Sequence, residues 1–252
     1  MVRDRMGLLV DTADAVARAM QGVQDANDFG LSGRRHGQYA LDLRADDAAL
    51  AVLRSAGVGV LSEESGLERP DAVEIVIIDP VDGSTNASRG IPWYATSLCL
   101  VDADGPAAAL VVNLASGVRY WAERGGGAFR DGEPIRASGL TRLGDAIVGL
   151  NGIPPQHLGY AQSRVFGAVA LDLCQVAAGV FDGYVDCIRE AHGAWDHAGG
   201  SLICREAGAV VVDCWDRDLF VLDHEARRTP IAAATPELLA PLLDARRAML
   251  PL

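Results

Sequence analysis

Lysine is absent from this sequence of 252 residues, so arginine supplies all 22 basic side chains, against 34 acidic ones. The formal net charge is −12 and the isoelectric point is about 4.8. Without a basic stripe to neutralise phosphates, binding of nucleic acid or of an anionic membrane is disfavoured. A small anionic substrate stays compatible, because the charge of a local site can differ from the global field.

Long apolar runs and paired cysteines are missing as well. No run of about 18 apolar residues occurs, and the first residues lack the apolar stretch of a signal peptide. The five cysteines are dispersed without a C-x-x-C pair, which is typical of reduced thiols. There is also no internal repeat or linker. We therefore expect a cytoplasmic protein.

The apolar patterns predict helices early in the chain and strands after them. Helical spacing predicts an amphipathic helix over 6–26 and, after a glycine-rich loop at 30–38, a second helix over 46–57 with acidic residues in its first turn. Strand-like segments end in acidic residues, and those between 93 and 135 are separated by short turns typical of an antiparallel sheet.

The second half of the sequence alternates between strands and helices, and Thr235 begins a closing helix as its N-cap. This change of pattern predicts an α+β protein of two fused halves in one compact unit, residues 1–138 and 139–252.

Three acidic clusters stand beside predicted strands or helix starts. They are Glu63–Glu64 in LSEESG, Asp79 and Asp82 in IIDPVDGSTN, and Asp196 in WDHAGG. Taken alone, each acidic pair is typical of a solvated turn, and Asp196 is typical of a residue that complements a helix dipole. Within DPVD, however, Pro80 fixes one φ angle, so that both carboxylates and the Val81 carbonyl can face one point.

Convergence of the three clusters would demand a cation. Two carboxylates 4 Å apart repel by on the order of 4 kcal/mol at an effective dielectric of 20. Several such pairs would rival the stability of a whole domain. Because the ligands would all be hard oxygens, Mg²⁺ is the leading candidate, with Mn²⁺ next. Two ions bridged by one carboxylate would support phosphoryl hydrolysis.

The segments LSEES, IIDPVDGSTN and WDHAGG…EAGA resemble, in the same order, the three signature motifs of the inositol monophosphatase family. The resemblance covers about residues 34–235. It implies the layered α-β-α-β-α sandwich shared with fructose-1,6-bisphosphatases. It also implies hydrolysis of a small phosphate monoester by water that Mg²⁺ activates, lithium sensitivity and a homodimer.

The resemblance also implies a role for individual residues. Two or three Mg²⁺ ions would be held by Glu63, Asp79, the Val81 carbonyl, Asp82 and Asp196. Ser84 stands where the family has a threonine beside the attacking water, so the catalytic set is Ser84, Glu63 and an aspartate of the segment DLRADD. Asp46 is the candidate for that aspartate and Asp47 the alternative.

The implied substrate contacts are Asp82, Gly83, Ser84, Gly167, Ala168, Asp186 and Arg189. Asp186 precedes Asp196 by ten residues rather than the seven usual in the family, so CIREAHGAW carries a three-residue insertion. We hypothesise that Asp186, Arg189, Glu190 and His192 set specificity; the alternative is an ordinary exposed loop. His197 is predicted to be structural. Arg34 and Arg35 are expected to form a solvated basic turn; the alternative is that one of them replaces a lysine common in the family.

The spacing D-x-x-D-G-S differs from the D-x-D-G-T of haloacid-dehalogenase phosphatases, which leave no role for Glu63 or Asp196. We therefore predict a phosphatase for an inositol or other cyclitol, sugar or histidinol phosphate. The alternatives are a nucleotide 3′-phosphatase, a sugar bisphosphatase or a non-catalytic binding protein of the same fold. A binding protein would gain nothing from retaining the carboxylate repulsion.

Overall fold

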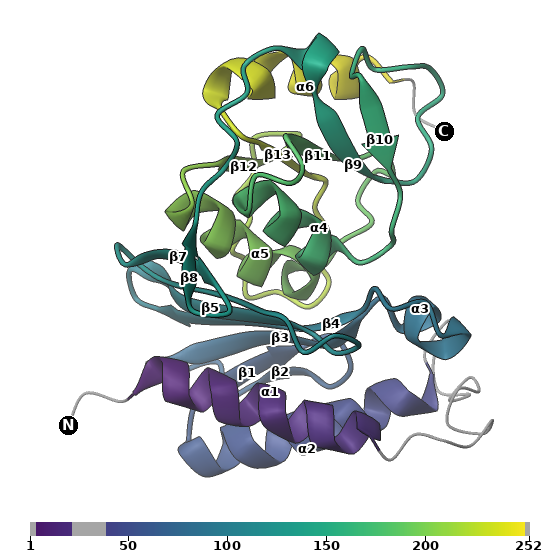
Figure 1. The fold of residues 1–252 in the computed structure, drawn as a ribbon. Coiled ribbons are helices and arrows are strands. Elements are labelled where there is room, and N and C mark those ends of the chain that lie inside the picture. The colour runs from purple at the N-terminus through teal and green to yellow at the C-terminus, as the bar shows by residue number, and fades with distance from the viewer. Residues whose placement is uncertain (1–3, 22–38, 250–252) are drawn as a thin grey trace.

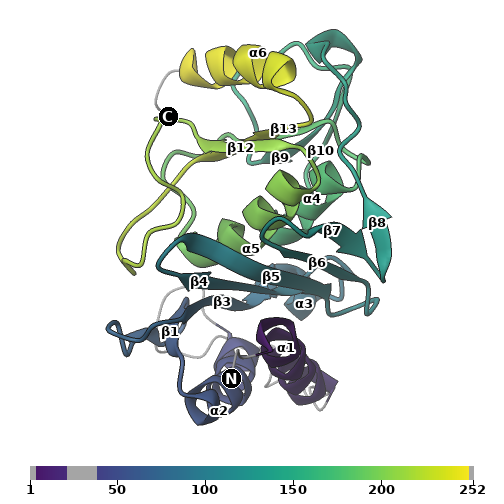
Figure 2. The ribbon, with the colours of Figure 1, turned by 90° about the vertical axis from the view of Figure 1, so that its left-hand side faces the viewer.

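Helices and sheets alternate in five layers in the computed structural model, which describes residues 4–21 and 39–249 (Figure 1). One pair of helices covers the outer face of an eight-stranded sheet, a second pair lies between this sheet and a five-stranded sheet, and a last helix covers the far face (Figure 2). In that order the helices are α1 (Arg5–Gln21), α2 (Ala40–Ala56), α4 (Val169–Ala177), α5 (Ala194–Glu206) and α6 (Pro236–Arg247). The predicted α-β-α-β-α sandwich is therefore confirmed.

The eight-stranded sheet has the order β2-β1-β3-β4-β5-β6-β7-β8. Strand β1 runs parallel to β3, and all other neighbours in this sheet are antiparallel. The strands are β1 (Gly59–Ser62), β2 (Gly66–Glu68), β3 (Ile75–Asp82), β4 (Ala95–Asp102), β5 (Gly105–Asn113), β6 (Arg119–Glu123), β7 (Gly127–Arg130) and β8 (Glu133–Ile135). The short helix α3 (Ser84–Arg89) follows β3.

The five-stranded sheet has the order β10-β9-β11-β13-β12 and is mixed. Strands β10, β9 and β11 are parallel, so their carboxyl ends share one edge, where ligands bind in open parallel sheets. The elements are β9 (Ile147–Asn151), β10 (Gln162–Arg164), β11 (Gly183–Asp186), β12 (Val210–Asp213) and β13 (Pro230–Ala233), preceded by a 3₁₀ turn at Leu143–Asp145.

The predicted start of the second helix is wrong. Helix α2 begins at Ala40 rather than at 46, because Tyr39 and Asp42 form a capping box in which the Tyr39 N–H donates to Asp42 Oδ2 over 2.8 Å. Asp46 therefore lies in the middle of the helix. The first helix spans Arg5–Gln21, while its predicted end and the loop at 30–38 lie outside the described residues.

Two further predictions from the sequence can be compared with the fold. Thr235 caps α6, since its Oγ1 accepts a hydrogen bond from the Leu238 N–H over 3.2 Å, which confirms the predicted helix start. All five cysteines are free and buried. Across the described ranges, no helix is both long enough and apolar enough to cross a bilayer.

The two predicted halves share their interior. Each sheet draws its strands from one side of the predicted boundary at 138, with β8 ending at Ile135 and β9 beginning at Ile147. Helix α5, however, packs its Trp195 side against Ile77 and other buried residues of the first sheet. The boundary stays a prediction, and the shared core fixes α5 above strand β3.

Strand β3 is buried along its whole length and contains a β-bulge near its end. Asp79 pairs with Ser97 and Asp82 with Ala95, so three steps along β3 match two along β4. Pro80 lies inside the bulge, where no ladder hydrogen bond is required of it. In a regular strand, residues three apart point to opposite faces. The extra residue therefore turns Asp79 and Asp82 toward the same side of the sheet.

Gly83 follows the bulge with φ +85°, and a Cβ there would lie 3.1 Å from both the Ala168 Cβ and the Trp93 carbonyl oxygen. Gly90 has φ +71° with open space around it. We expect Gly90→Ala to cost about 1 kcal/mol of unfolding free energy through backbone strain alone. Gly83→Ala should cost roughly 1–3 kcal/mol more, because its neighbours are two backbone carbonyl oxygens and the short Ala168 side chain, which have little room to move. Urea unfolding would measure both; equal losses would contradict the close packing.

Candidate metal centre

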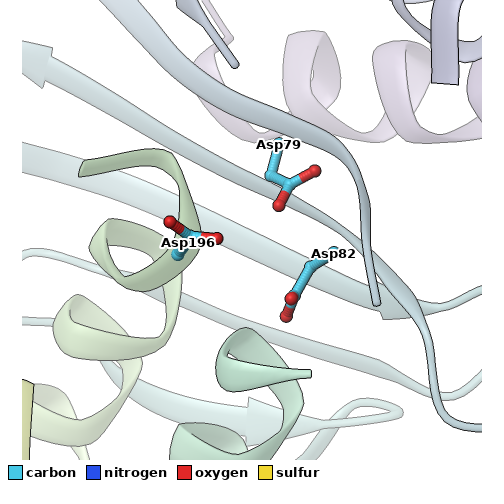
Figure 3. Close-up of side chains that lie close together, drawn as sticks. All are labelled: Asp79, Asp82 and Asp196. Atoms are coloured by element: carbon cyan, nitrogen blue, oxygen red, sulfur yellow. The ribbon is translucent and has the colours of Figure 1, made fainter. Parts of the chain in front are cut away.

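Three carboxylates converge between the first sheet and helix α5. Asp79 and Asp82 come from β3 and Asp196 from the first turn of α5, and their side chains point toward one another (Figure 3). One oxygen atom from each lies within 4.8 Å of the others. Asp79 is 1% and Asp82 6% exposed. No other such group of three His, Cys, Asp or Glu side chains occurs in the parts of the chain that the structure describes.

Backbone N–H groups hold one oxygen of each carboxylate. Such bonds fix the side chains and leave the second oxygen of each carboxylate without a backbone donor among these bonds. The three bonds are Val81 N–H to Asp79 Oδ1 (2.9 Å), Ala170 N–H to Asp82 Oδ2 (2.7 Å) and Gly193 N–H to Asp196 Oδ2 (2.7 Å). The donors for Asp82 and Asp196 lie at the starts of α4 and α5, where the helix dipole also favours negative charge.

Burial and mutual repulsion raise the pKa of these carboxyl groups. Burial raises the pKa of Asp79 well above its usual value, and the charges of Glu63 and Asp82 raise it further. Burial and then Asp196 raise the pKa of Asp82 to about 7. Ionised at neutral pH, the cluster needs a compensating charge. Its donor set, all carboxylate oxygen, fits a hard divalent cation.

Glu63 lies beside this group but outside the set of three. It follows β1, its N–H donates to the Ile78 carbonyl over 3.2 Å, and its own carbonyl oxygen lies 3.0 Å from His224 Nε2. Burial and then the charge of Asp196 raise the pKa of Glu63 well above its usual value. The structure thus brings Glu63 into the electrostatic field of the three aspartates. Val81, the predicted carbonyl ligand, is buried within the bulge.

Helix α2 presents Asp42 to the cluster rather than Asp46 or Asp47. Asp46 Oδ1 accepts a hydrogen bond from the Ser62 hydroxyl over 2.5 Å, and Asp47 is exposed. Asp42 is buried, and its charge contributes to the raised pKa of both Glu63 and Asp79. The sequence-based prediction does not include Asp42, although Asp42 opens the same DLRADD segment, because the family resemblance points to the aspartate that ends the segment.

The start of α2 also lies close to the start of α3. The Tyr39 hydroxyl lies 3.3 Å from Thr85 Oγ1, next to the half-buried Ser84. Asp42 belongs to the same capping box as Tyr39. This contact places the acidic end of α2 beside the predicted catalytic serine.

Backbone from both halves of the chain meets at Gly83. A Cβ on Gly83 would lie 3.1 Å from the Ala168 Cβ and 3.2 Å from the Gly167 carbonyl oxygen, so three predicted substrate-contact residues lie together. Asn86 fixes this junction, because its Nδ2 donates to the carbonyl oxygens of Trp93 (2.8 Å) and Phe166 (2.7 Å). No local sequence pattern marks Asn86 for this contact.

The four residues predicted to set specificity divide into two pairs. Asp186 is fully buried and His192 is 9% exposed, with His192 between Asp186 and Asp196. Arg189 instead lies over the Trp215 ring at 5.4 Å, and Glu190 forms an ion pair with Arg217 at 2.9 Å. The second pair therefore contacts the segment after β12.

The two histidines near the start of α5 have opposite electrostatic environments. Burial lowers the pKa of His192, but the carboxylates of Asp196, Asp186 and Asp82 outweigh it and raise the pKa to about 9. His197 is fully buried, and burial lowers its pKa to about 4. His197 thus has the buried, neutral character of a structural residue.

Comparisons with known proteins agree with this geometry. The model of the inositol monophosphatase family matches residues 13–249. The chain belongs to the inositol monophosphatase family. It is therefore a phosphatase, a phosphoric monoester hydrolase, which the names of its relatives support.

Members of the inositol monophosphatase family resemble the chain over most of their length. The fructose-1,6-bisphosphatase/inositol-1-monophosphatase of Archaeoglobus fulgidus is 34% identical, over 96% of this chain and 98% of its own. The inositol-1-monophosphatase of Mesorhizobium japonicum is also 34% identical, over 82% and 85%. The crystal structure of the extragenic suppressor protein suhB from Bartonella henselae superposes with a TM-score of 0.80 at 29% identity, over 96% and 98%.

The raised pKa of Asp82 predicts how stability depends on pH when metal is chelated. Its contribution to the unfolding free energy is fully present below its usual pKa and is lost as pH rises through about 7. In EDTA, the unfolding free energy should fall by a few kcal/mol between about pH 4 and pH 7, at about 1.4 kcal/mol per pKa unit. Asp82→Asn should flatten this fall and the exposed Asp71→Asn should not. Identical slopes in all three proteins would contradict the prediction.

Proposed function

We propose that this protein is a Mg²⁺-dependent phosphatase that hydrolyses a small phosphate monoester of an inositol, another cyclitol, a sugar or histidinol. The observation that carries the proposal is the convergence of the carboxylates of Asp79, Asp82 and Asp196. Burial raises the pKa of Asp79 and Asp82, so their ionised forms need a cation. Relatives named inositol-1-monophosphatase and fructose-1,6-bisphosphatase support a compact phosphorylated polyol as substrate.

The carboxylates and one carbonyl would hold the metal. Asp79, Asp82, Asp196, Glu63 and the Val81 carbonyl are the proposed ligands for two or three Mg²⁺ ions, for which Mn²⁺ can substitute. When bound, such ions offset the carboxylate charge, polarise the phosphate ester and make water more acidic.

The remaining roles belong to residues around Gly83. The Ser84 hydroxyl and an aspartate of α2 orient the attacking water, and the aspartate takes its proton. The water oxygen bonds to phosphorus, the ester P–O bond breaks, and the leaving oxygen takes a proton from solvent water. Asp42 suits this role better than Asp46, because its charge acts on Glu63 and Asp79. The Gly83 and Ser84 N–H groups hold phosphate oxygens, and Asp82 also faces the substrate.

The leaving alcohol would lie toward the second half of the chain. We propose that the backbone of Gly167 and Ala168 contacts it, at the junction that Asn86 closes. Substrate contacts by Asp186 and Arg189 stay predictions. The Arg189 guanidinium would have to leave the Trp215 ring to reach a substrate.

A sugar bisphosphatase is the second candidate function. The Pyrococcus furiosus relative, 32% identical over 78% of each chain, is named fructose-1,6-bisphosphatase, which favours this alternative over a nucleotide 3′-phosphatase. A non-catalytic binding protein is disfavoured, because it would keep the cost of burying the carboxylates without using them. The homodimer, lithium sensitivity and cytoplasmic location stay predictions.

Phosphate release from a panel of esters tests the proposal. The panel holds inositol 1-phosphate, histidinol phosphate, fructose 1,6-bisphosphate and adenosine 3′,5′-bisphosphate, each with Mg²⁺ and with EDTA. We expect phosphate release that requires Mg²⁺. In Asp79→Asn, kcat/KM should fall by at least about 100-fold, because several kcal/mol of transition-state stabilisation are lost. Asp71→Asn is the control. Phosphate release that persists in EDTA, or no phosphate release from any of the esters, would count against the proposal.

The aspartate that partners Ser84 can be identified with two matched variants on one helix. Asp42→Asn should lower kcat by about 10²–10⁴-fold, because the proton acceptor is lost while the phosphate contacts remain. Asp46→Asn should keep kcat within a few-fold and change mainly the melting temperature, since its partner is Ser62. Steady-state kinetics at saturating Mg²⁺ would measure both. The reverse result would restore Asp46 as the partner.

A further inference from the structure

One oxygen of Asp196 lies near two nitrogen atoms at the start of α5. Its Oδ2 accepts the Gly193 N–H over 2.7 Å and lies 3.6 Å from His192 Nδ1. Both contacts go to the same oxygen, which leaves Oδ1 to serve as a ligand. The orientation of the carboxylate therefore depends on what holds the His192 ring.

In its neutral form the His192 ring is held by Asn151, at the carboxyl edge of the second sheet. Asn151 Nδ2 lies 3.0 Å from His192 Nε2 and donates to Asp186 Oδ1 over 2.9 Å. One amide nitrogen carries two hydrogens, so it can serve both partners. Asn151 and Asp186 are paired in register on the parallel strands β9 and β11, which makes the support rigid.

The main chain of His192 is fixed as well. Its N–H donates to the Arg228 carbonyl over 3.3 Å, and the Arg228 N–H donates back over 2.8 Å. With ring and backbone both held, His192 has little freedom to move away from Asp196. In the neutral ring that accepts from Asn151, Nδ1 carries the proton and faces Asp196. In the imidazolium Nδ1 does the same, while Nε2–H faces Asp186 Oδ2 at 3.4 Å.

We propose that His192 is a positioning residue that holds the Asp196 carboxylate in its ligand orientation, and that Asn151 acts through His192. The proposal rests on the proposed function, in which Asp196 holds a divalent cation. Hydrogen-bond donors behind a ligand fix its orientation and are costly to lose. It also gives the three-residue insertion before Asp196 a role, because the lengthened loop carries His192.

Binding of Mn²⁺ to the EDTA-stripped, dialysed protein tests this directly, with the free ion counted by electron paramagnetic resonance. We expect His192→Leu to raise the Mn²⁺ dissociation constant by about 10–100-fold. His192→Gln, which keeps an N–H donor, should recover most of the affinity. His157→Leu, at an exposed histidine, is the matched control and should bind as the unmodified protein does.

Asn151→Leu removes both N–H groups and should weaken Mn²⁺ binding less than His192→Leu. The double variant should bind no more than about threefold more weakly than His192→Leu alone, because two residues that act in series are not additive. Fully additive losses would overturn the role of Asn151. The Mg²⁺ concentration for half-maximal phosphatase activity should rise in the same order, with kcat recovering at saturating Mg²⁺.

Two outcomes separate this inference from the function on which it rests. If the unmodified protein does not bind Mn²⁺, the proposed metal-dependent function fails. If it binds Mn²⁺ and His192→Leu binds equally well, only the positioning role is overturned. Equal losses in His192→Gln and His192→Leu would mean a packing role and would also overturn it. Should His192→Leu not fold, His192→Gln and Asn151→Leu decide the question.

Discussion

The burial of two like-charged carboxylates at the end of one strand is the constraint on which the rest of this structure depends. Asp79 and Asp82 are withdrawn from water, and burial raises the pKa of both. Nearby carboxylates raise them further, Glu63 and Asp82 for Asp79 and Asp196 for Asp82. Such an arrangement persists only where donors fix each carboxylate and a counter-charge is available. Backbone N–H groups fix the carboxylates of Asp79 and Asp82. The carboxylate oxygens of the group are suitable ligands for a cation that supplies the counter-charge.

The layered fold is the means by which these donors reach the carboxylates. Because α4 and α5 lie between the two sheets, both helices can begin at the end of β3 (Figures 1 and 2). Asp82 from the first half therefore accepts a hydrogen bond from the start of α4 in the second half. Gly83 and Asn86 close the same junction from the other side. The site lies where the halves meet, so neither half holds it alone.

The site is surrounded by rigid secondary-structure elements on one side and by the loop after β11, which can vary in sequence and length, on the other. The carboxylates and the turn after them lie on a buried strand and on helix starts, where geometry is rigid. The residues after β11 lie on a loop, and loops tolerate insertion while they carry specificity. In this chain the loop sends Arg189 and Glu190 toward the segment after β12 and keeps His192 beside Asp196. Common phosphatase chemistry and a distinct substrate preference are thus compatible within one family.

Local sequence alone determined the features that depend on neighbouring residues. The strand that ends in DPVDG, the cap at Thr235 and the acidic start of α5 follow from short patterns, and three separated motifs were enough to predict the layered fold. Tertiary structure decided the rest. The charge of Asp42 acts on Glu63 and Asp79 because α2 packs against β1 and β3. Asn86 and Asn151 act on residues far along the chain. Helix and strand propensities depend on adjacent residues. Contacts between residues far apart in the sequence form only when the separate layers pack together.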